Sequence, residues 1–299
     1  MKSKRDLLTL NDLGAEGILA VVHRAEALKQ ERIRGEKLSR PLEGKSVALI
    51  FEKPSTRTRV SFEVGVFELG AHPVVLNARD TQMGRGEPIE DTARVLSRYV
   101  HAIVLRTFAD ATMEALAKHA TVPVINALTD GGHPCQILAD LQTVLQRKGK
   151  LSGLKYAWVG DGNNVANSWI EACALLDLEL TLAVPEGYEP SRPMDNVRIK
   201  LVRDPQQAVR DADVVITDVW ASMGQEAESA KRAAAFAGYC ITPELLSVSA
   251  PDVMVLHCLP AHRGEEIHEI YLDGPDAAVW DEAENRLHAQ KALLEYLVR

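Results

Sequence analysis

Short apolar runs that alternate with helix-like segments are the main pattern along the chain. The first half has strand-like runs at Val47–Phe51, Pro73–Asn77, Ala102–Arg106 and Val122–Ile125. The second half continues with Lys155–Gly160, Glu179–Pro185, Val197–Val202, Val214–Asp218 and Val253–Leu256. Helical patterns separate most of these runs, at about 57–69, 90–99, 110–119, 135–147, 165–177, 205–211 and 226–237. The alternation predicts an α/β fold with parallel sheets covered by helices on both faces.

The expected architecture is two doubly wound parallel-sheet domains with a cleft between them. The polar, glycine-containing segment Arg147–Gly153 is the predicted junction. We place the first domain at residues 1–148 and the second at residues 149–281. A helix rich in Ala, Leu and Glu over about 282–299 is expected to pack back on the first domain. The length of 299 residues suits two domains of ordinary size.

Composition and charge exclude several function classes. The chain is 46% hydrophobic and 25% charged, as globular proteins are, and no apolar run approaches the roughly 20 residues that span a bilayer. A net charge of −8 disfavours general nucleic-acid binding. The basic start leads into an amphipathic stretch without a signal-peptide core. The four cysteines show no disulfide framework, so we expect a cytoplasmic protein.

The segment Ser55–Arg59 follows the first strand and opens a helix. Backbone N–H groups and the helix dipole favour an anion at such a helix start. The hydroxyl groups of Ser55, Thr56 and Thr58 add donors, and arginine forks match phosphate oxygens. The alternative is a helix cap followed by a solvated basic turn, which needs fewer arginines and hydroxyls than this segment has.

Polar residues also follow other strands, at the positions where parallel α/β sheets bind ligands. Since the carboxyl ends of parallel strands share one edge, we expect these residues to line one cleft. They are Arg106, Asn163 with Asn164, Asp218, and the segment His257–Pro260.

His133 and Gln136 lie one helical turn apart in His133-Pro134-Cys135-Gln136, after Gly131-Gly132. Both side chains can therefore reach one ligand at the helix start. The His133 imidazole can donate to a carbonyl oxygen, and the Gln136 oxygen can accept from an amide. The alternative is a capped helix with a half-buried histidine.

Asp218 ends a strand and precedes a loop of small residues, Val219–Gly224. A carboxylate at this position can pair with a substrate ammonium group. Ser222 and Gly224 would allow the loop to close. The alternative is a turn that Asp218 only caps.

Cofactor and metal hypotheses have weaker support. The segment Gly160–Asn164 resembles the start of a dinucleotide fingerprint, but the third glycine is missing. His133, Cys135 and the segment His257–His262 lack the spacings typical of zinc sites. We therefore expect no metal and no cofactor. Nothing in the sequence shows that a base lies beside the Cys258 thiol in space, so a thiol that contacts substrate and a nucleophile both stay open, the second with less support.

Together these motifs resemble the ornithine branch of the aspartate/ornithine carbamoyltransferase family. The resemblance runs from Phe51–Arg59 to Asn285–His288. The Ser-Thr-Arg-Thr run at 55–58 and His-Pro-x-Gln at 133–136 are typical of the whole family. The loop Ser222–Gly224 and the segment His257–Pro260 are similar to the ornithine branch, whereas the aspartate branch typically has a second proline in place of Cys258.

The resemblance implies carbamoyl transfer from carbamoyl phosphate to L-ornithine, giving L-citrulline and phosphate, as in arginine biosynthesis or the urea cycle. It implies a homotrimer, in some members part of a larger assembly, with the loop Thr81–Glu87 reaching a neighbour's site. The implied catalytic residues are Arg106, His133 and Cys258. The implied carbamoyl phosphate ligands are Ser55, Thr56, Arg57, Thr58, Gln82, Arg106, His133, Gln136, Cys258, Leu259 and Arg286. The implied ornithine ligands are Asn164, Asp218, Ser222 and Met223.

Other functions stay open at this point. A related carbamoyltransferase could act on aspartate, putrescine or an acylated amino acid, and a substrate panel would separate these. A dehydrogenase that uses Gly160–Asn164 would bind NAD. A binding module without activity would show affinity without turnover.

Overall fold

The computed structural model describes residues 4–36, 39–77, 79, 81–83, 86–221 and 228–298. The chain divides into two compact units. Unit 1 comprises Met1–Gln142 and Asn285–Arg299, and unit 2 comprises Thr143–Glu284. The divisions fall within α5 (Pro134–Lys148) and α11 (Val279–Val298), so each of these helices contributes to both units.

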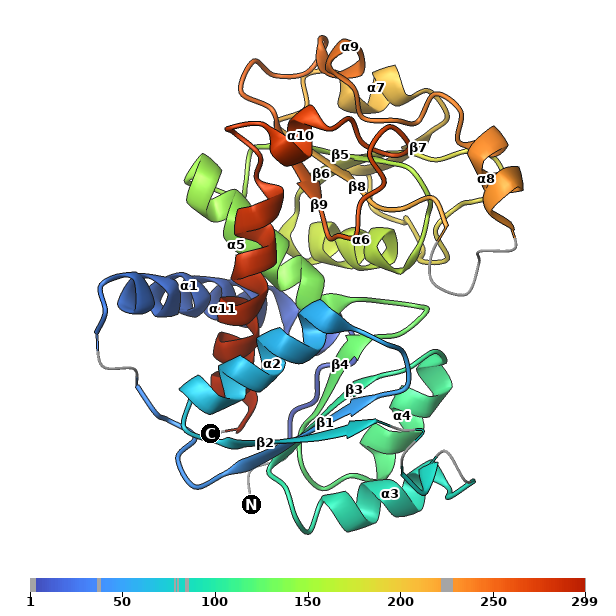
Figure 1. Cartoon of the computed structure of the whole chain (residues 1–299). Helices are drawn as coiled ribbons and strands as arrows, with labels where there is room; N and C mark the ends of the chain where they lie inside the picture. The colour runs from blue at the N-terminus through green and yellow to red at the C-terminus, as the bar shows by residue number, and fades with distance from the viewer. Residues whose placement is uncertain are drawn as a thin grey trace. The chain divides into compact units, whose positions relative to one another are not determined.

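Unit 1 is built on a parallel sheet with strand order β2-β1-β3-β4 (Figure 1). Its strands are β1 (Ser46–Phe51), β2 (His72–Asn77), β3 (Ala102–Arg106) and β4 (Val124–Leu128). Its other helices are η1 (Leu10–Asp12), α1 (Gly14–Ile33), α2 (Thr56–Glu68), α3 (Ile89–Leu96) and α4 (Asp110–His119).

The unit 1 sheet is buried on both faces, which explains its continuous apolar strands. Side chains alternate between faces along a strand. Ala48 and Ile50 of β1 therefore point the same way, and they pack with Met113 and Leu116 of α4 and with Ala93 of α3. Helix α2 packs against β1 and β2, and Figure 1 shows it across the sheet from α3.

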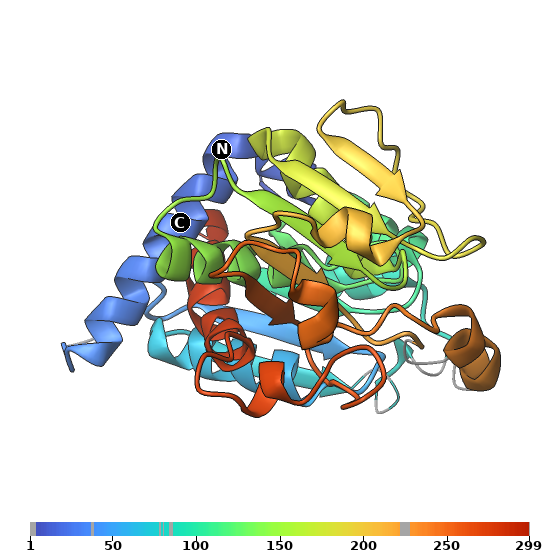
Figure 2. The same cartoon turned by 90° about the horizontal axis from the view of Figure 1, so that it is seen from above.

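Unit 2 has a parallel sheet with strand order β7-β6-β5-β8-β9. Figure 2 shows these strands side by side from above, with short connecting helices over them. The strands are β5 (Lys155–Val159), β6 (Glu179–Ala183), β7 (Ile199–Val202), β8 (Val214–Thr217) and β9 (Met254–His257). The helices are α6 (Asn164–Leu176), α7 (Pro205–Val209), α8 (Ser229–Ala235), α9 (Pro243–Leu246) and α10 (Ile270–Asp273).

Different helices cover the two faces of the unit 2 sheet. On one face, Ala157 and Val255 pack with Val209 of α7 and Phe236. On the other face, the ring of Tyr156 lies 5.5 Å from that of Trp169 in α6. This arrangement confirms the predicted fold class of two parallel sheets with flanking helices.

Each sheet has a topological switch point, where the chain leaves the central strand first to one side and later to the other. In unit 1 this point lies between β1 and β3, and in unit 2 between β5 and β8. The crevice at such a point, beyond the carboxyl ends of the strands, is the usual ligand site of open α/β sheets. The segments that leave these strand ends carry the chemistry described below.

All predicted strands are present, with ends that differ by a few residues, and helix α1 was not assigned from sequence. Its buried residues Ile18, Val21, Val22, Ala25 and Leu28 repeat at helical spacing. Among the described residues, no helix has the length and apolar character required to cross a membrane.

Candidate active site

Helix α2 begins shortly after the end of β1, at the unit 1 switch point. Ser55 caps the helix, and its Oγ accepts from the backbone N–H of Thr58 at 3.3 Å. The first turn contains no acidic residue. Arg59 pairs with Glu63 at 3.6 Å, whereas no ion pair joins Arg57 to a carboxylate in the described part of the chain. The exposed Arg57 and the N–H groups of this turn therefore suit an anionic ligand.

Arg286 connects three helices of unit 1. Its Nη2 donates to Thr58 Oγ1 at 3.2 Å, and its Nη1 donates to Gln136 Oε1. Gln136 is fixed further because its Nε2 donates to Asp140 Oδ1 at 2.7 Å. The Arg286 side chain is 5% exposed, so its charge acts in an environment with little screening by water. The guanidinium group therefore holds α2, α5 and α11 in register at the same place.

His133 stands at the start of α5, after a tight loop. The loop brings Gly131 against the side chain of Asp110, and a Cβ at position 131 would lie 2.0 Å from Asp110 Oδ2, so that this exposed carboxylate would have to rotate away. The pKa of His133 is well below its usual value, chiefly because the ring is buried and also because Arg286 and Arg106 are close to it. The imidazole is therefore neutral at neutral pH and can donate a hydrogen bond without carrying charge.

Arg106 ends β3, on the other side of the unit 1 switch point. Its backbone oxygen accepts from Glu52 N at 2.9 Å, which keeps the end of β3 beside the end of β1. The side chain is 8% exposed, and its charge contributes to the low pKa of His133. Arg106 and Arg286 are therefore both close enough to the neutral imidazole of His133 for their charges to lower its pKa.

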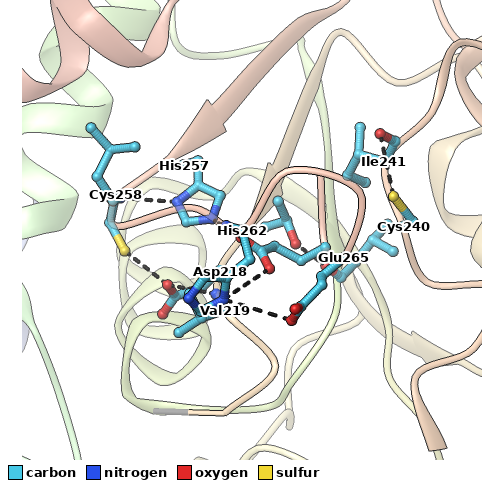
Figure 3. A network of polar contacts seen from close by, with 12 residues as sticks. Asp218, Val219, Cys240, Ile241, His257, Cys258, His262 and Glu265 are labelled. Carbon is cyan, nitrogen blue, oxygen red and sulfur yellow. Dashed lines mark hydrogen bonds and ion pairs between the residues drawn. The ribbon is translucent and has the colours of Figure 1, made fainter. Parts of the chain in front are cut away.

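Asp218 follows β8 at the unit 2 switch point and is held by three donors. Asn163 Nδ2 donates to its Oδ2 at 2.7 Å, and its own neighbour Val219 N donates to Oδ1 at 2.8 Å. The thiol of Cys258 donates to the same Oδ1 at 3.1 Å, as Figure 3 shows. Asp218 is 6% exposed, so unit 2 presents a nearly buried carboxylate beside a thiol.

Asn163 links this carboxylate to helix α6. Its Oδ1 accepts from the N–H groups of Val165 and Ala166 at 2.9 and 3.2 Å, which is the geometry of a helix cap. The cap fixes the orientation of the amide, so that Nδ2 is turned toward Asp218. The capped helix start and the strand-end acid are therefore one hydrogen-bonded unit.

His257 and Glu266 fix the segment that carries Cys258. His257 Nδ1 accepts from Leu259 N at 2.9 Å, so Nε2 carries the proton of the neutral ring and donates to Glu266 Oε1 at 3.0 Å. Glu282 Oε2 accepts from the backbone N–H of His257 at 2.8 Å. Leu259, whose N–H makes one of these bonds, has φ +58°, a backbone conformation that is uncommon for leucine.

A second acid, Asp161, lies at the end of β5. Burial raises its pKa to about 6, against the effect of Arg232, whose Nη1 is 3.0 Å from Asp161 Oδ2. The negative charge of Asp218 also raises this pKa. The charge of Asp161 is partly balanced by the paired Arg232. Asp218, in contrast, is the acid that the Cys258 thiol contacts.

The structure brings some of the expected site residues together and leaves others apart. Thr58, Gln136 and Arg286 are joined by hydrogen bonds, as are Asp218 and Cys258. Gln82 lies exposed in the loop after β2, with no side-chain hydrogen bond to another described residue. Asn164 lies on the first turn of α6. Ser222 and Met223 lie outside the described residues.

The sequence pattern places Asn163 at a strand end in the expected cleft but gives it no capping role, and it singles out neither Asp161 nor Glu266. The capping role of Asn163 could have been found from its position before an apolar helical run, which is a capping signal. Nothing in the sequence indicates that Arg232 pairs with Asp161 or that Glu266 pairs with His257, since these contacts depend on the folding of distant segments.

The fold and the two switch points define a two-unit α/β protein that suits an anion in unit 1 and a positively charged group in unit 2. Comparison with known proteins identifies the family to which the chain belongs. Residues 5–146 match the model of the aspartate/ornithine carbamoyltransferase carbamoyl-P binding domain. Residues 152–297 match the model of the Asp/Orn binding domain of the same family. The chain therefore belongs to the aspartate/ornithine carbamoyltransferase family.

Similar proteins cover its full length. The ornithine carbamoyltransferase of Geobacter metallireducens is 56% identical over 302 aligned positions, covering 99% of each chain. The structure of ornithine carbamoyltransferase from Pyrococcus furiosus has a TM-score of 0.94 and 50% identity, covering 99% of this chain and 97% of that one. The enzyme from Thermus thermophilus has a TM-score of 0.91 and 44% identity, covering 99% of both chains.

Proposed function

We propose that this protein transfers the carbamoyl group of carbamoyl phosphate to the side-chain amine of L-ornithine, giving L-citrulline and phosphate. The observation that carries the choice of acceptor is the nearly buried Asp218 beside the Cys258 thiol. A carboxylate in this setting attracts an ammonium group and repels a dicarboxylate such as aspartate. The full-length relatives named ornithine carbamoyltransferase support the same acceptor.

Carbamoyl phosphate is a dianion and fits the charge of the unit 1 group. In the proposal its phosphate is bound by Ser55, Thr56, Arg57 and Thr58 at the start of α2, with Gln82 as a further donor. Arg57 has no carboxylate partner among the described residues, which leaves its fork available for phosphate oxygens. The α2 dipole adds to the attraction.

Attack on the carbamoyl carbon places negative charge on the carbonyl oxygen and then expels phosphate. In the proposal, Arg106 and the neutral imidazole of His133 donate to the developing oxyanion. Preorganised donors of this kind contribute roughly 3–4 kcal/mol each in known cases. Arg286 and Gln136 position this group, because they tie α2, α5 and α11 together.

Ornithine must present a neutral amine, although an alkylammonium such as that of lysine has a pKa near 10.4. In the proposal the acceptor is bound by Asn164, Asp218, Ser222 and Met223, and Cys258 with Leu259 lines the reacting end. Cys258 is a hydrogen-bond donor to Asp218 in the structure, which supports a role in substrate contact and not as a nucleophile. No metal and no cofactor takes part in this scheme.

The wider setting belongs to the same proposal. We assign residues 1–148 to carbamoyl phosphate binding and 149–281 to ornithine binding, with the helix at 282–299 serving the first domain. The assembly is a homotrimer, the pathway is arginine biosynthesis, and the location is the cytoplasm, where the four free cysteines would stay reduced. Size-exclusion chromatography with light scattering tests the trimer.

A product assay tests the function. The purified protein is supplied with carbamoyl phosphate and, in parallel, with L-ornithine, L-aspartate or putrescine, and the carbamoylated product is identified by mass spectrometry. We expect citrulline with ornithine and turnover at least a hundredfold lower with the other amines. Carbamoylaspartate as the main product, or binding of ornithine without turnover, would refute the assignment.

A further inference from the structure

We propose that His262, Glu265 and Glu266 form a binding site for a divalent transition-metal ion of the zinc type. These residues follow the Cys258 segment but are not part of the acceptor site proposed above. His262 Nδ1 lies 3.7 Å from Glu265 Oε2 and 3.7 Å from Glu266 Oε2. All three ligand atoms lie within 4.8 Å of one another. Figure 3 shows His262 and Glu265 pointing toward each other from the same loop.

The strongest indication of a ligand is the second oxygen of Glu266. The side chain is completely buried, and its Oε1 accepts from His257 and from the backbone N–H of His262. Its Oε2 is buried and has no hydrogen-bond partner in the described part of the chain. A buried carboxylate oxygen without a donor is costly, and a cation between Oε2 and the His262 ring would satisfy it.

The distances suit a metal better than direct contact. A separation of 3.7 Å is too long for a hydrogen bond between His262 Nδ1 and Glu266 Oε2. Zinc binds imidazole nitrogen and carboxylate oxygen at about 2.0–2.2 Å, which puts two tetrahedral ligand atoms about 3.4 Å apart. Small side-chain rotations of the exposed His262 and Glu265 would close the difference, and the open side of the site faces water.

The loop that presents the three ligands is held by its own hydrogen bonds. Glu265 N donates to His262 O at 3.0 Å, and Gly264 N donates to Ile267 O at 3.0 Å. The backbone of Glu266 is also bound, since its oxygen accepts from Ile241 N at 2.9 Å. The backbone positions of the three residues are therefore held without a bound ion, so that binding has to order only the side chains of His262 and Glu265, which reduces the entropy lost on binding.

The local charge also suits a divalent cation. Two carboxylates carry a charge of −2, and a neutral imidazole completes a nitrogen and oxygen ligand set typical of zinc, nickel or cobalt. The neighbouring Arg263 does not compete, because its guanidinium is paired with Asp273 at 2.8 Å.

A second cluster, of Asp218, His257 and Cys258, also has ligand atoms near one another. Both ring nitrogens of His257 are already used, one by Leu259 N and the other by Glu266. This histidine therefore cannot bind a metal without breaking the bonds that fix the Cys258 segment. The His262 cluster requires no such loss, and the choice between the two clusters can be tested.

The test is zinc binding by the full-length protein after treatment with a chelator. Titration of ZnCl2 against a chromophoric competitor should show one tight site per chain. His262→Gln and Glu265→Gln each remove an exposed ligand without disturbing the core, and each should weaken binding at least about tenfold, since even outer-shell changes cost 10–100-fold. His72→Gln and Glu269→Gln are matched controls on other exposed residues and should bind as the wild type does.

A cobalt spectrum and one more variant distinguish the clusters. Co2+ at the His262 site should give ligand-field bands without the charge-transfer band of a thiolate, and Cys258→Ser should bind zinc as the wild type does. The proposal is overturned if the wild type binds no zinc, if His262→Gln binds normally, or if Cys258→Ser abolishes binding.

Discussion

Replacement of Asp218 by Asn removes the negative charge of the proposed ornithine site. It also puts one hydrogen bond at risk, because Asn163 Nδ2 donates to Asp218 Oδ2 at 2.7 Å in the wild type and an amide nitrogen at that position cannot accept. In the variant the new amide can take two orientations. In one, its nitrogen faces Asn163 Nδ2, so that two donors meet. In the other, its oxygen no longer accepts from Val219 N and Cys258 Sγ. The Asn163 side-chain amide cannot flip to relieve this contact without losing the cap of α6, which its oxygen provides. The single substitution therefore changes both charge and network.

The magnitudes follow from these contacts. An unsatisfied buried polar group costs about 1–3 kcal/mol of stability, so urea unfolding of Asp218→Asn should show a loss in that range. A hydrogen bond to a charged group contributes about 1.5–3 kcal/mol, so kcat/KM for ornithine should fall by roughly 10- to 150-fold. Carbamoyl phosphate binding should change less, since Cys258 is the one of its proposed ligands that is hydrogen-bonded to Asp218 among the described residues.

The double variant Asn163→Asp/Asp218→Asn separates the two effects. The new carboxylate at position 163 would cap α6 with one oxygen and accept from the new amide at position 218 with the other. The oxygen of that amide would still accept from Val219 N and Cys258 Sγ. The network is restored with its charge on the other residue, so stability should return to within about 1 kcal/mol of the wild type. Turnover with ornithine should stay at least about tenfold below the wild type.

The assay is steady-state citrulline formation for the wild type, both single variants and the double variant, with urea unfolding of each. If the double variant regains activity together with stability, the charge at position 218 has no role in ornithine binding. Asp218 would then be a structural cap, and the acceptor site would have to be sought elsewhere.

Other predictions concern the phosphate site, the order of binding and pH. Arg57→Lys should raise KM for carbamoyl phosphate or lower kcat at least about tenfold, or roughly 1.4 kcal/mol, because lysine lacks the fork, and unchanged kinetics would remove Arg57 from the site. If carbamoyl phosphate completes the ornithine pocket, calorimetry should show tighter norvaline binding in its presence, and equal affinities would contradict this. Burial raises the pKa of Asp161 from 3.8 to about 6, so the folded protein holds this proton more tightly than the unfolded chain does. As the pH rises from about 4 to about 6, the wild type should therefore lose up to about 3 kcal/mol of unfolding free energy relative to Asp161→Asn. Profiles of urea stability against pH that run parallel for the two proteins would refute this pKa.

The strands and the polar residues at their ends could be predicted from the sequence because they depend on local patterns. Apolar runs bounded by turn residues locate β1, β3, β5 and β8, and a rule for parallel sheets places ligands at their carboxyl ends. The capped start of α2 is equally local, since Ser55 acts on a residue only three positions away. These features need no knowledge of tertiary contacts.

The contacts that orient the site could not be predicted in this way. Arg286 reaches Thr58 across 228 positions and Gln136 across 150, so the sequence gives no sign that these side chains meet. The tautomer of His257 depends on Glu266 and on the backbone of Leu259 together. Its neighbour Cys258 was assigned a site role from sequence, but the donor role of the thiol follows only from the position of Asp218.

The two helix starts at the switch points differ in a way that explains the opposite charges of their proposed ligands. Ser55 has one oxygen, which accepts from Thr58 N, so the earlier N–H groups of α2 stay available to an anion. Asn163 uses its oxygen for two N–H groups of α6 and has an amide left over, which binds the carboxylate of Asp218. The α6 start is thereby satisfied within the protein, and in the proposed function the fixed carboxylate is the charged group that a ligand meets. In that proposal the same strand–cap–helix plan serves an anion in unit 1 and an ammonium group in unit 2, and the choice of cap residue decides between them.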